Sequence, residues 1–155
     1  MKVLVAIDGE VFAKAITDII CSHRWEQGAR FRLINVCHLC YCINGSSINS
    51  GNAVGADEIV LQETREIISK NIPGANIECV TRFGDPAEEL LAECKGWKPD
   101  LLVMGSHGQK YCGRHLLGSV SHFLINHIDC SALIVRLPAD ISQQHVISAS
   151  ASASA

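Results

Sequence analysis

Segments typical of buried β-strands alternate strictly with segments whose apolar residues recur at helical spacing, and this alternation limits the possible folds more than any other feature. The apolar run at residues 3–7 is the clearest of the strands. The pattern predicts an α/β fold with one doubly wound, five-stranded parallel sheet, and 155 residues suit a single domain. We expect strands at residues 3–7, 31–36, 77–83, 101–104 and 132–135, and helices at residues 11–23, 58–71, 119–128 and from residue 86 onward.

The helix expected from residue 86 onward has the best-marked start. Asp85 is suited to be its N-cap acceptor, Pro86 suits the first helical position, and Glu88 places a carboxylate near the free amides of the first turn. Gly96 is expected to end the helix.

Polar residues and glycines follow two of the expected strands. Asp8 and Gly9 come after the first strand, and residues 105–108 (Gly-Ser-His-Gly) come after the fourth. Doubly wound sheets bind ligands beyond the carboxyl ends of their strands, so we expect both segments at one binding edge. Asp8 is the stronger indication, because an acid that closes an apolar strand is costly to bury unless it is paired.

A further pair, Gly118 and Ser119, stands where the last expected helix begins. Glycines let backbone amides approach an anion closely, and a helix N-terminus offers unpaired N–H groups to a phosphate. Ser119 can donate its hydroxyl to phosphate or cap the helix, and both roles are open.

The spacing Gly105-x2-Gly108-x9-Gly118-Ser119, together with the segments 3–9, 84–87 and 118–121, resembles the universal stress protein family in its ATP-binding branch. The resemblance implies a flavodoxin-like, adenine nucleotide alpha hydrolase-like sheet in the order 3-2-1-4-5. It also implies a homodimer joined through the fifth strand, Ala132 to Val135, and a bound ATP, ADP or AMP, with Mg²⁺ as a candidate companion ion.

The same resemblance implies which residues contact the nucleotide. Asp8 would meet the ribose or adenine, the backbone of Val36 would hold the base, and Met104 would line the adenine. Val36 and Met104 equally suit plain core packing, because each ends a buried strand. The implied set is Ala6, Ile7, Asp8, Val36, Met104, Gly105, His107, Gly108, Gly118, Ser119 and Val120.

One departure from the family concerns phosphate binding. Glu10 and Val11 follow Gly9, where the family commonly has Ser or Thr, and an acidic side chain pointing inward would repel phosphate. Lys110 and Arg114 can offset that charge, although exposed loop cations are more often solvated.

Residues 37–57 are expected to form a long crossover loop. Cys37, His38, Cys40 and Cys42 include donor types that zinc accepts, but the paired half of a zinc site is missing. Metal binding, thiol oxidation and an ordinary lid or dimer contact all stay open for this loop.

None of the remaining reactive residues indicates a catalytic site. Of the histidines near the proposed site, His107 can approach the nucleotide, while His115, His122 and His127 suit a surface or interface and form no metal-binding pair. The chain has neither a P-loop nor a GxGxxG fingerprint, and we find no general base, so slow ATP hydrolysis is the most that we expect.

Four cysteines are expected to be buried, reduced thiols: Cys21, Cys79, Cys94 and Cys130.

The opening apolar run is too short for a signal peptide or a membrane span, so we expect a cytoplasmic protein. A net charge of −3 without a basic run argues against nucleic acid or a membrane as partner. Residues 1–138 are expected to form the domain and residues 139–155 a low-complexity tail. The sequence therefore favours an ATP-binding regulatory protein of the stress response, with a dimeric interaction module that binds no nucleotide as the alternative.

Overall fold

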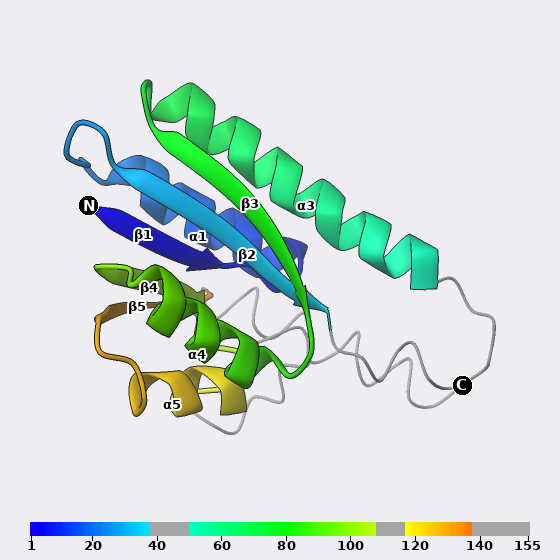
Figure 1. Ribbon diagram of the computed structural model, residues 1–155. Coiled ribbons are helices and arrows are strands. Elements are labelled where there is room, and N and C mark those ends of the chain that lie inside the picture. The colour runs from blue at the N-terminus through cyan, green and yellow to red at the C-terminus, as the bar shows by residue number, and fades with distance from the viewer. Residues whose placement is uncertain (38–49, 108–116, 138–155) are drawn as a thin grey trace.

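The computed structural model describes residues 1–37, 50–107 and 117–137 and has one five-stranded parallel sheet (Figure 1). The strand order is β3-β2-β1-β4-β5, which confirms the predicted fold class. Each strand lies within one residue of its predicted bounds. The strands are β1 (Lys2–Ala6), β2 (Arg30–Cys37), β3 (Asn76–Phe83), β4 (Leu101–Gly105) and β5 (Ser131–Val135).

Helices cover both faces of the sheet. The central strands carry apolar side chains on each face, so both faces have to be buried. α1 (Glu10–Ser22) and α3 (Ser50–Asn71) lie on one face, where Val3 and Val5 join Ile16 of α1 in the core. α4 (Pro86–Trp97) and α5 (Ser119–Ile125) lie on the other face and pack over Leu4 and Leu102 (Figure 1). The sheet is thus buried between two layers of helices, and its carboxyl edge is left for loops.

The start of α4 is confirmed, but its predicted end at Gly96 is wrong. The Asp85 carboxylate accepts hydrogen bonds from the amides of Ala87 and Glu88, at 2.9 and 3.1 Å. The helix continues to Trp97 and ends because Lys98 adopts the left-handed conformation, with φ of 50°, and donates its amide to the Cys94 carbonyl.

Two other helices differ from expectation at their ends. α3 begins at Ser50 rather than at residue 58. The prediction missed these first turns because residues 50–57 show no apolar periodicity. The last eight residues of the expected crossover loop are therefore helical. α5 ends at Ile125 rather than at residue 128, because the amides of Asn126 and His127 bond three residues back and tighten the turn.

Several predictions fall outside the described residues. They concern most of the cysteine-rich loop, the middle of the glycine pattern and the domain boundary after residue 138. No helix in the described ranges is long and apolar enough to cross a membrane.

Candidate functional site

The turn after β1 is held by a polar side chain that sequence reasoning missed. The Ile7 amide donates to the Ile34 carbonyl at 2.8 Å, and Ile7 is buried, while Asp8 is exposed at the sheet edge. Asn35, only 2% exposed, donates its side-chain amide to the Ile7 carbonyl at 3.0 Å. A polar residue within the otherwise apolar stretch 33–36 of β2 was the available signal for this positioning role.

Gly9 and Glu10 follow directly and begin α1. Gly9 is the N-cap with φ of 77°, a backbone conformation that glycine adopts without steric cost. Glu10 is the first helical residue and is exposed. The carboxylate that departs from the family pattern therefore belongs to the first turn of the helix beside Asp8.

The segment after β4 is joined to the start of α5. The Gly118 amide donates to the Ser106 carbonyl at 2.7 Å, and the Ser121 hydroxyl donates to the same carbonyl at 2.9 Å. A Cβ on Gly118 would lie 3.3 Å from the Cα of His107. The His107 ring is itself 3.1 Å from the Ser106 hydroxyl through Nδ1. The described parts of the glycine pattern, far apart in sequence, are thus in direct contact.

Ser119 is exposed and is the first residue of α5. The N-cap is Gly118, so the capping role considered for Ser119 is wrong. The proposed hydroxyl donor stands at the surface beside the backbone of Gly118.

Gly105 has a packing role that explains its missing side chain. A Cβ at this position would lie 2.6 Å from the Phe12 ring of α1 and 3.0 Å from the His107 carbonyl oxygen. Gly105 therefore lets α1 approach the end of β4.

The apolar members of the predicted set divide between the two faces of the sheet. Met104 is 3% exposed and belongs to the core under α4 and α5, so its packing role is confirmed and its ligand contact stays a prediction. Ile7 belongs to the core on the opposite face. Three partly buried residues pack against the Met104 side: Ala6, Val36 and Val120.

Asp57 of α3 is a second residue at this edge that sequence reasoning missed. Burial raises the pKa of the Asp57 carboxyl, and the nearby charge of Asp8 raises that pKa further. Two carboxylates thus lie close enough to repel each other. Nothing in the sequence pattern links two residues almost fifty positions apart.

Other predicted residues either lie outside the described ranges or are exposed on the surface. Gly108, Lys110, Arg114 and His115 lie outside the described residues. His122 and His127 are exposed on and after α5, as predicted for surface residues. In the described ranges, no group of three or more His, Cys, Asp or Glu side chains can hold a metal ion.

The predicted cysteine burial is confirmed for Cys94 and holds in part for three others. Cys94 is 7% exposed, whereas Cys21, Cys79 and Cys130 are half-buried. All four are free thiols.

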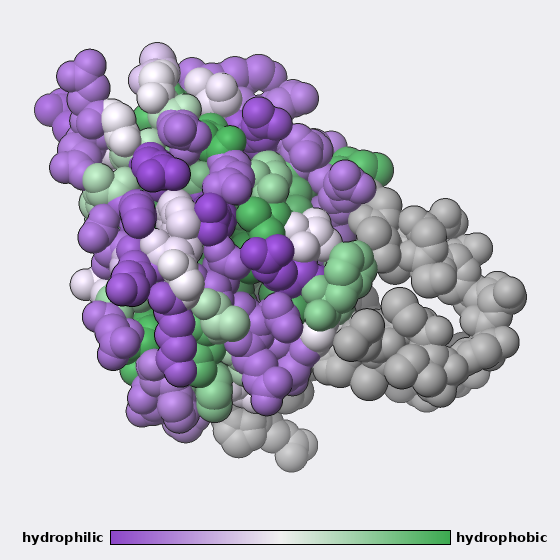
Figure 2. All heavy atoms as spheres, in the orientation of Figure 1, coloured by the Kyte–Doolittle hydropathy of each residue, from purple (hydrophilic) through white to green (hydrophobic). Residues whose placement is uncertain are grey.

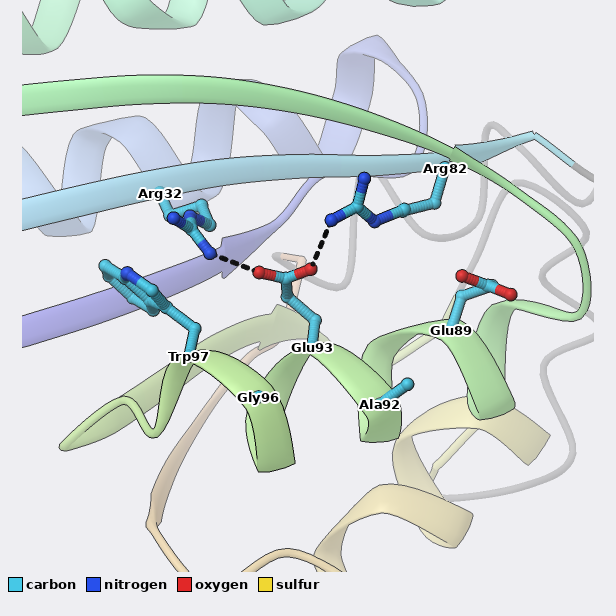
Figure 3. A pocket seen from close by; sticks show the side chains of 7 residues that line it. All are labelled: Arg32, Arg82, Glu89, Ala92, Glu93, Gly96 and Trp97. Atoms are coloured by element: carbon cyan, nitrogen blue, oxygen red, sulfur yellow. Dashed lines mark hydrogen bonds and ion pairs between the residues drawn. The ribbon is translucent and has the colours of Figure 1, made fainter.

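A hollow of about 380 Å³ lies away from the edge, between α4 and the face of β2 and β3 (Figure 3). Glu93, only 7% exposed, accepts from Arg32 and from Arg82, the latter at 3.0 Å. The Arg32 guanidinium also stacks 4.5 Å from the Trp97 ring. The lining residues are Arg32, Arg82, Glu89, Ala92, Glu93, Gly96 and Trp97.

The charged groups at the centre of this hollow pair with one another, and none of the predicted site residues lines it. The face of the molecule in Figure 2 is largely hydrophilic, with smaller hydrophobic areas. We assign the hollow to an ion-pair network that holds α4 against the sheet.

Known proteins resemble this chain in sequence. The model of the universal stress protein family matches residues 1–136. Universal stress protein Sll1388 of Synechocystis is 26% identical over 155 residues, which cover 87% of this chain and 97% of the relative.

Solved structures share the fold at low sequence identity. A universal stress protein family protein from Arabidopsis thaliana with AMP bound has a TM-score of 0.62 at 19% identity, covering 91% of this chain and 94% of that one. The universal stress protein from Archaeoglobus fulgidus in complex with dAMP has a TM-score of 0.62 at 14% identity, covering 87% and 97%.

Proposed function

This chain belongs to the universal stress protein family, and on that premise we propose that it binds an adenine nucleotide at the carboxyl edge of its sheet. The proposed site lies between the Asp8–Gly9 turn, residues 105–107 and the start of α5. Related proteins of this fold have been solved with AMP and with dAMP, which supports the ligand class.

The observation that carries the proposal is the contact between the Ser106–His107 backbone and Gly118. It brings a loop that follows a buried strand against the first turn of a helix. The Gly118 amide is already bonded to Ser106. The next amides of this turn, with the exposed hydroxyl of Ser119 beside them, are suited to phosphate oxygens. Asp8, exposed on the neighbouring strand end, is suited to accept hydrogen bonds from ribose or adenine.

We propose further that ATP is the physiological nucleotide and that it is read through the pattern Gly105-x2-Gly108-x9-Gly118-Ser119. In this proposal Ala6, Val36 and Met104 line the base, and occupancy regulates contacts in a cytoplasmic stress response. Mg²⁺ is a candidate companion of the phosphates.

One feature favours the alternative, a dimeric module that binds no nucleotide. Glu10 places a carboxylate in the first turn of α1, directly after the Asp8–Gly9 turn. Its charge, added to that of Asp8, opposes an anionic ligand.

The deciding experiment is isothermal titration of nucleotide-stripped protein with ATP, AMP and GTP, with and without Mg²⁺. We expect micromolar affinity for ATP, about −8 kcal/mol, and no response to GTP. Ser119→Ala removes an exposed hydroxyl at the proposed site and should weaken ATP binding roughly tenfold. Ser131→Ala, an exposed serine at the opposite end of a strand, is the matched control and should leave binding unchanged.

Flat titrations with every nucleotide would reject the proposal in favour of the nucleotide-free module. Glu10→Gln then identifies the cause. If that variant binds nucleotide, the loss is due to the Glu10 charge. If it also shows no binding, the loss is due to the site as a whole.

A further inference from the structure

β2 continues past the end of β1, and the hydrogen-bond ladder between the two strands stops there (Figure 1). The paired register ends at Ala6 and Ile34, and the last ladder bond runs from the Ile7 amide to the Ile34 carbonyl at 2.8 Å. Parallel ladders repeat evenly, so the Ile7 carbonyl would next accept the Val36 amide. Among the described residues that bond is absent, and the Asn35 side chain donates to the Ile7 carbonyl at 3.0 Å in its place.

The Asn35 amide is held in one orientation at both of its ends. Its oxygen, Oδ1, lies 3.3 Å from the Cys37 sulfur and accepts the thiol proton, while its nitrogen donates to Ile7. The Asn35 side chain is only 2% exposed, so water has little access to either bond. A buried amide is costly unless it is hydrogen-bonded, and these two contacts therefore keep its donor end on the Ile7 carbonyl.

The backbone of Val36 is left facing the space beyond β1. Along a strand of a parallel sheet, the N–H and C=O groups of one residue point to the same side, and successive residues alternate. Ile34 bonds toward β1, and Cys37 bonds toward β3, where its carbonyl accepts the Gly84 amide at 3.1 Å. Val36, two residues after Ile34, therefore directs both of its backbone groups to the β1 side, where the ladder has ended. A hydrogen-bond donor and an acceptor thus stand together at the carboxyl edge of the sheet.

We propose that Asn35 is a positioning and specificity-determining residue: by holding the Ile7 carbonyl, it keeps the backbone N–H and C=O of Val36 open to a nucleobase. The identity of the ligand rests on the proposed function, whereas the release of the Val36 backbone does not.

The open pair at Val36 distinguishes between purines. Adenine presents an acceptor nitrogen, N7, beside its donor amino group at N6, which complements one donor and one acceptor. Guanine presents N7 and O6 at the same edge, and both are acceptors, so one of them would face the Val36 carbonyl without a hydrogen bond. The pair therefore favours adenine over guanine.

Hydrogen exchange of the ligand-free protein tests the release of Val36 without any nucleotide. NMR of isotope-labelled protein follows the amides one by one. We expect the Val36 amide to exchange roughly tenfold faster than the Ile34 amide, which lies within the ladder. Asn35→Leu frees the Ile7 carbonyl, so the ladder gains one bond and the Val36 amide should exchange roughly tenfold more slowly than in the wild type. A merely structural role for Asn35 predicts the opposite, because a destabilised protein exchanges faster.

Thr17→Val is the matched control. Thr17 is 3% exposed, and its hydroxyl donates to the Ala13 carbonyl at 2.6 Å within α1, so this change also removes one buried donor. It should leave the exchange of the Val36 amide, relative to that of Ile34, as it is in the wild type.

Titration of the same proteins with ATP tests the consequence for binding. Asn35→Leu should weaken ATP binding roughly tenfold, and Thr17→Val should leave it unchanged. Bound ATP should also slow the exchange of the Val36 amide in the wild type. If the wild type binds no nucleotide, the proposed function fails, and the exchange measurements still decide the role of Asn35.

The proposal is wrong if the Val36 amide of the ligand-free wild type exchanges as slowly as the Ile34 amide. This comparison needs no variant, so it stands even if Asn35→Leu does not fold. Unchanged or faster exchange of Val36 in a folded Asn35→Leu variant would also overturn the proposal, as would ATP binding that leaves the Val36 amide of the wild type unprotected.

Discussion

Gly105 illustrates how a residue chosen from a ligand-binding pattern can also be required by its neighbours in the fold. The space that a Cβ would occupy is taken by the Phe12 ring, which is 5% exposed in the core between α1 and the sheet. The missing side chain therefore stabilises the protein whether or not a nucleotide is present.

The Gly105→Ala variant should lose about 1–3 kcal/mol of unfolding free energy, because the added methyl group overpacks the contact with Phe12. Combining it with Phe12→Leu should cost less than the sum of the two single changes. Gly96→Ala is the control, since a Cβ there meets no atom within 4 Å, and it should stabilise α4 by about 0.5–1 kcal/mol. Urea unfolding of the wild type and the four variants measures these changes, and equal midpoints for the two single alanine variants would contradict the packing role.

The Asp8 and Asp57 carboxylates predict a pH dependence of stability. Burial and the Asp8 charge raise the pKa of Asp57 above its ordinary value, so the folded state binds this proton more tightly than the unfolded state. The resulting stabilisation is fully present below the ordinary carboxyl pKa and is lost as pH rises through the folded-state pKa.

Asp57→Asn should therefore be more stable than the wild type at neutral pH, and the difference should shrink as the solution is made acidic. Unfolding midpoints in urea between neutral and acid pH measure this difference. A constant gap across the range would show that the Asp57 charge has no part in it.

Among the elements, α4 depends on a buried ion pair as well as on its apolar face. Arg32 of β2 contacts two carboxylates: Glu93 of α4, as Figure 3 shows, and Glu78 of β3. Glu93 is 7% exposed, whereas Glu78 is 50% exposed. Burial alone would lower the pKa of Arg32, but the hydrogen bonds and charges of the two carboxylates raise it.

These two carboxylates provide a matched pair of substitutions. Glu93→Gln should cost about 3 kcal/mol of unfolding free energy, because it leaves a half-buried guanidinium without its buried counter-charge. Glu78→Gln should cost roughly 0–1 kcal/mol, because water screens that pair. Chemical unfolding of both variants measures the difference, and similar costs would mean that burial does not strengthen the Glu93 contacts.

For the whole molecule, the open edges of the sheet decide how copies can associate. β5 pairs with β4 alone among the described strands, and its Ala132 is exposed beside the half-buried Leu133 and Ile134. An edge strand of this kind is suited to pair with a second copy, as proposed for the homodimer. β3 forms the opposite edge.

We propose that the protein dimerises through β5. On that proposal, Ala132→Lys should shift it from dimer to monomer in light scattering coupled to size exclusion, because a lysine at this edge opposes strand pairing. Asn76→Lys places the same charge on β3 and should leave the dimer intact. A monomeric wild type, or dissociation of the β3 variant instead, would exclude β5 as the interface.

Local sequence determined the elements of this protein, because strand and helix formation depend on apolar periodicity and on short-range hydrogen bonds. The five strands and the Asp85 cap follow from residues within a few positions of each other. The start of α3 did not, because its first turns lack an apolar pattern, and the end of α4 depends on the backbone conformation of Lys98 rather than on Gly96. For the candidate site, the pattern identified Asp8, Gly105 and Gly118 but could not assign their contacts.

Contacts between residues far apart in the chain were decided only by the folded structure. The Gly105 contact with Phe12, the Asn35 hydrogen bond to Ile7 and the approach of Asp57 to Asp8 all join separate elements. Each depends on how the helices pack on the sheet. That packing is set by the volumes and charges of side chains that are close in space but far apart in sequence, so no local sequence pattern predicts it.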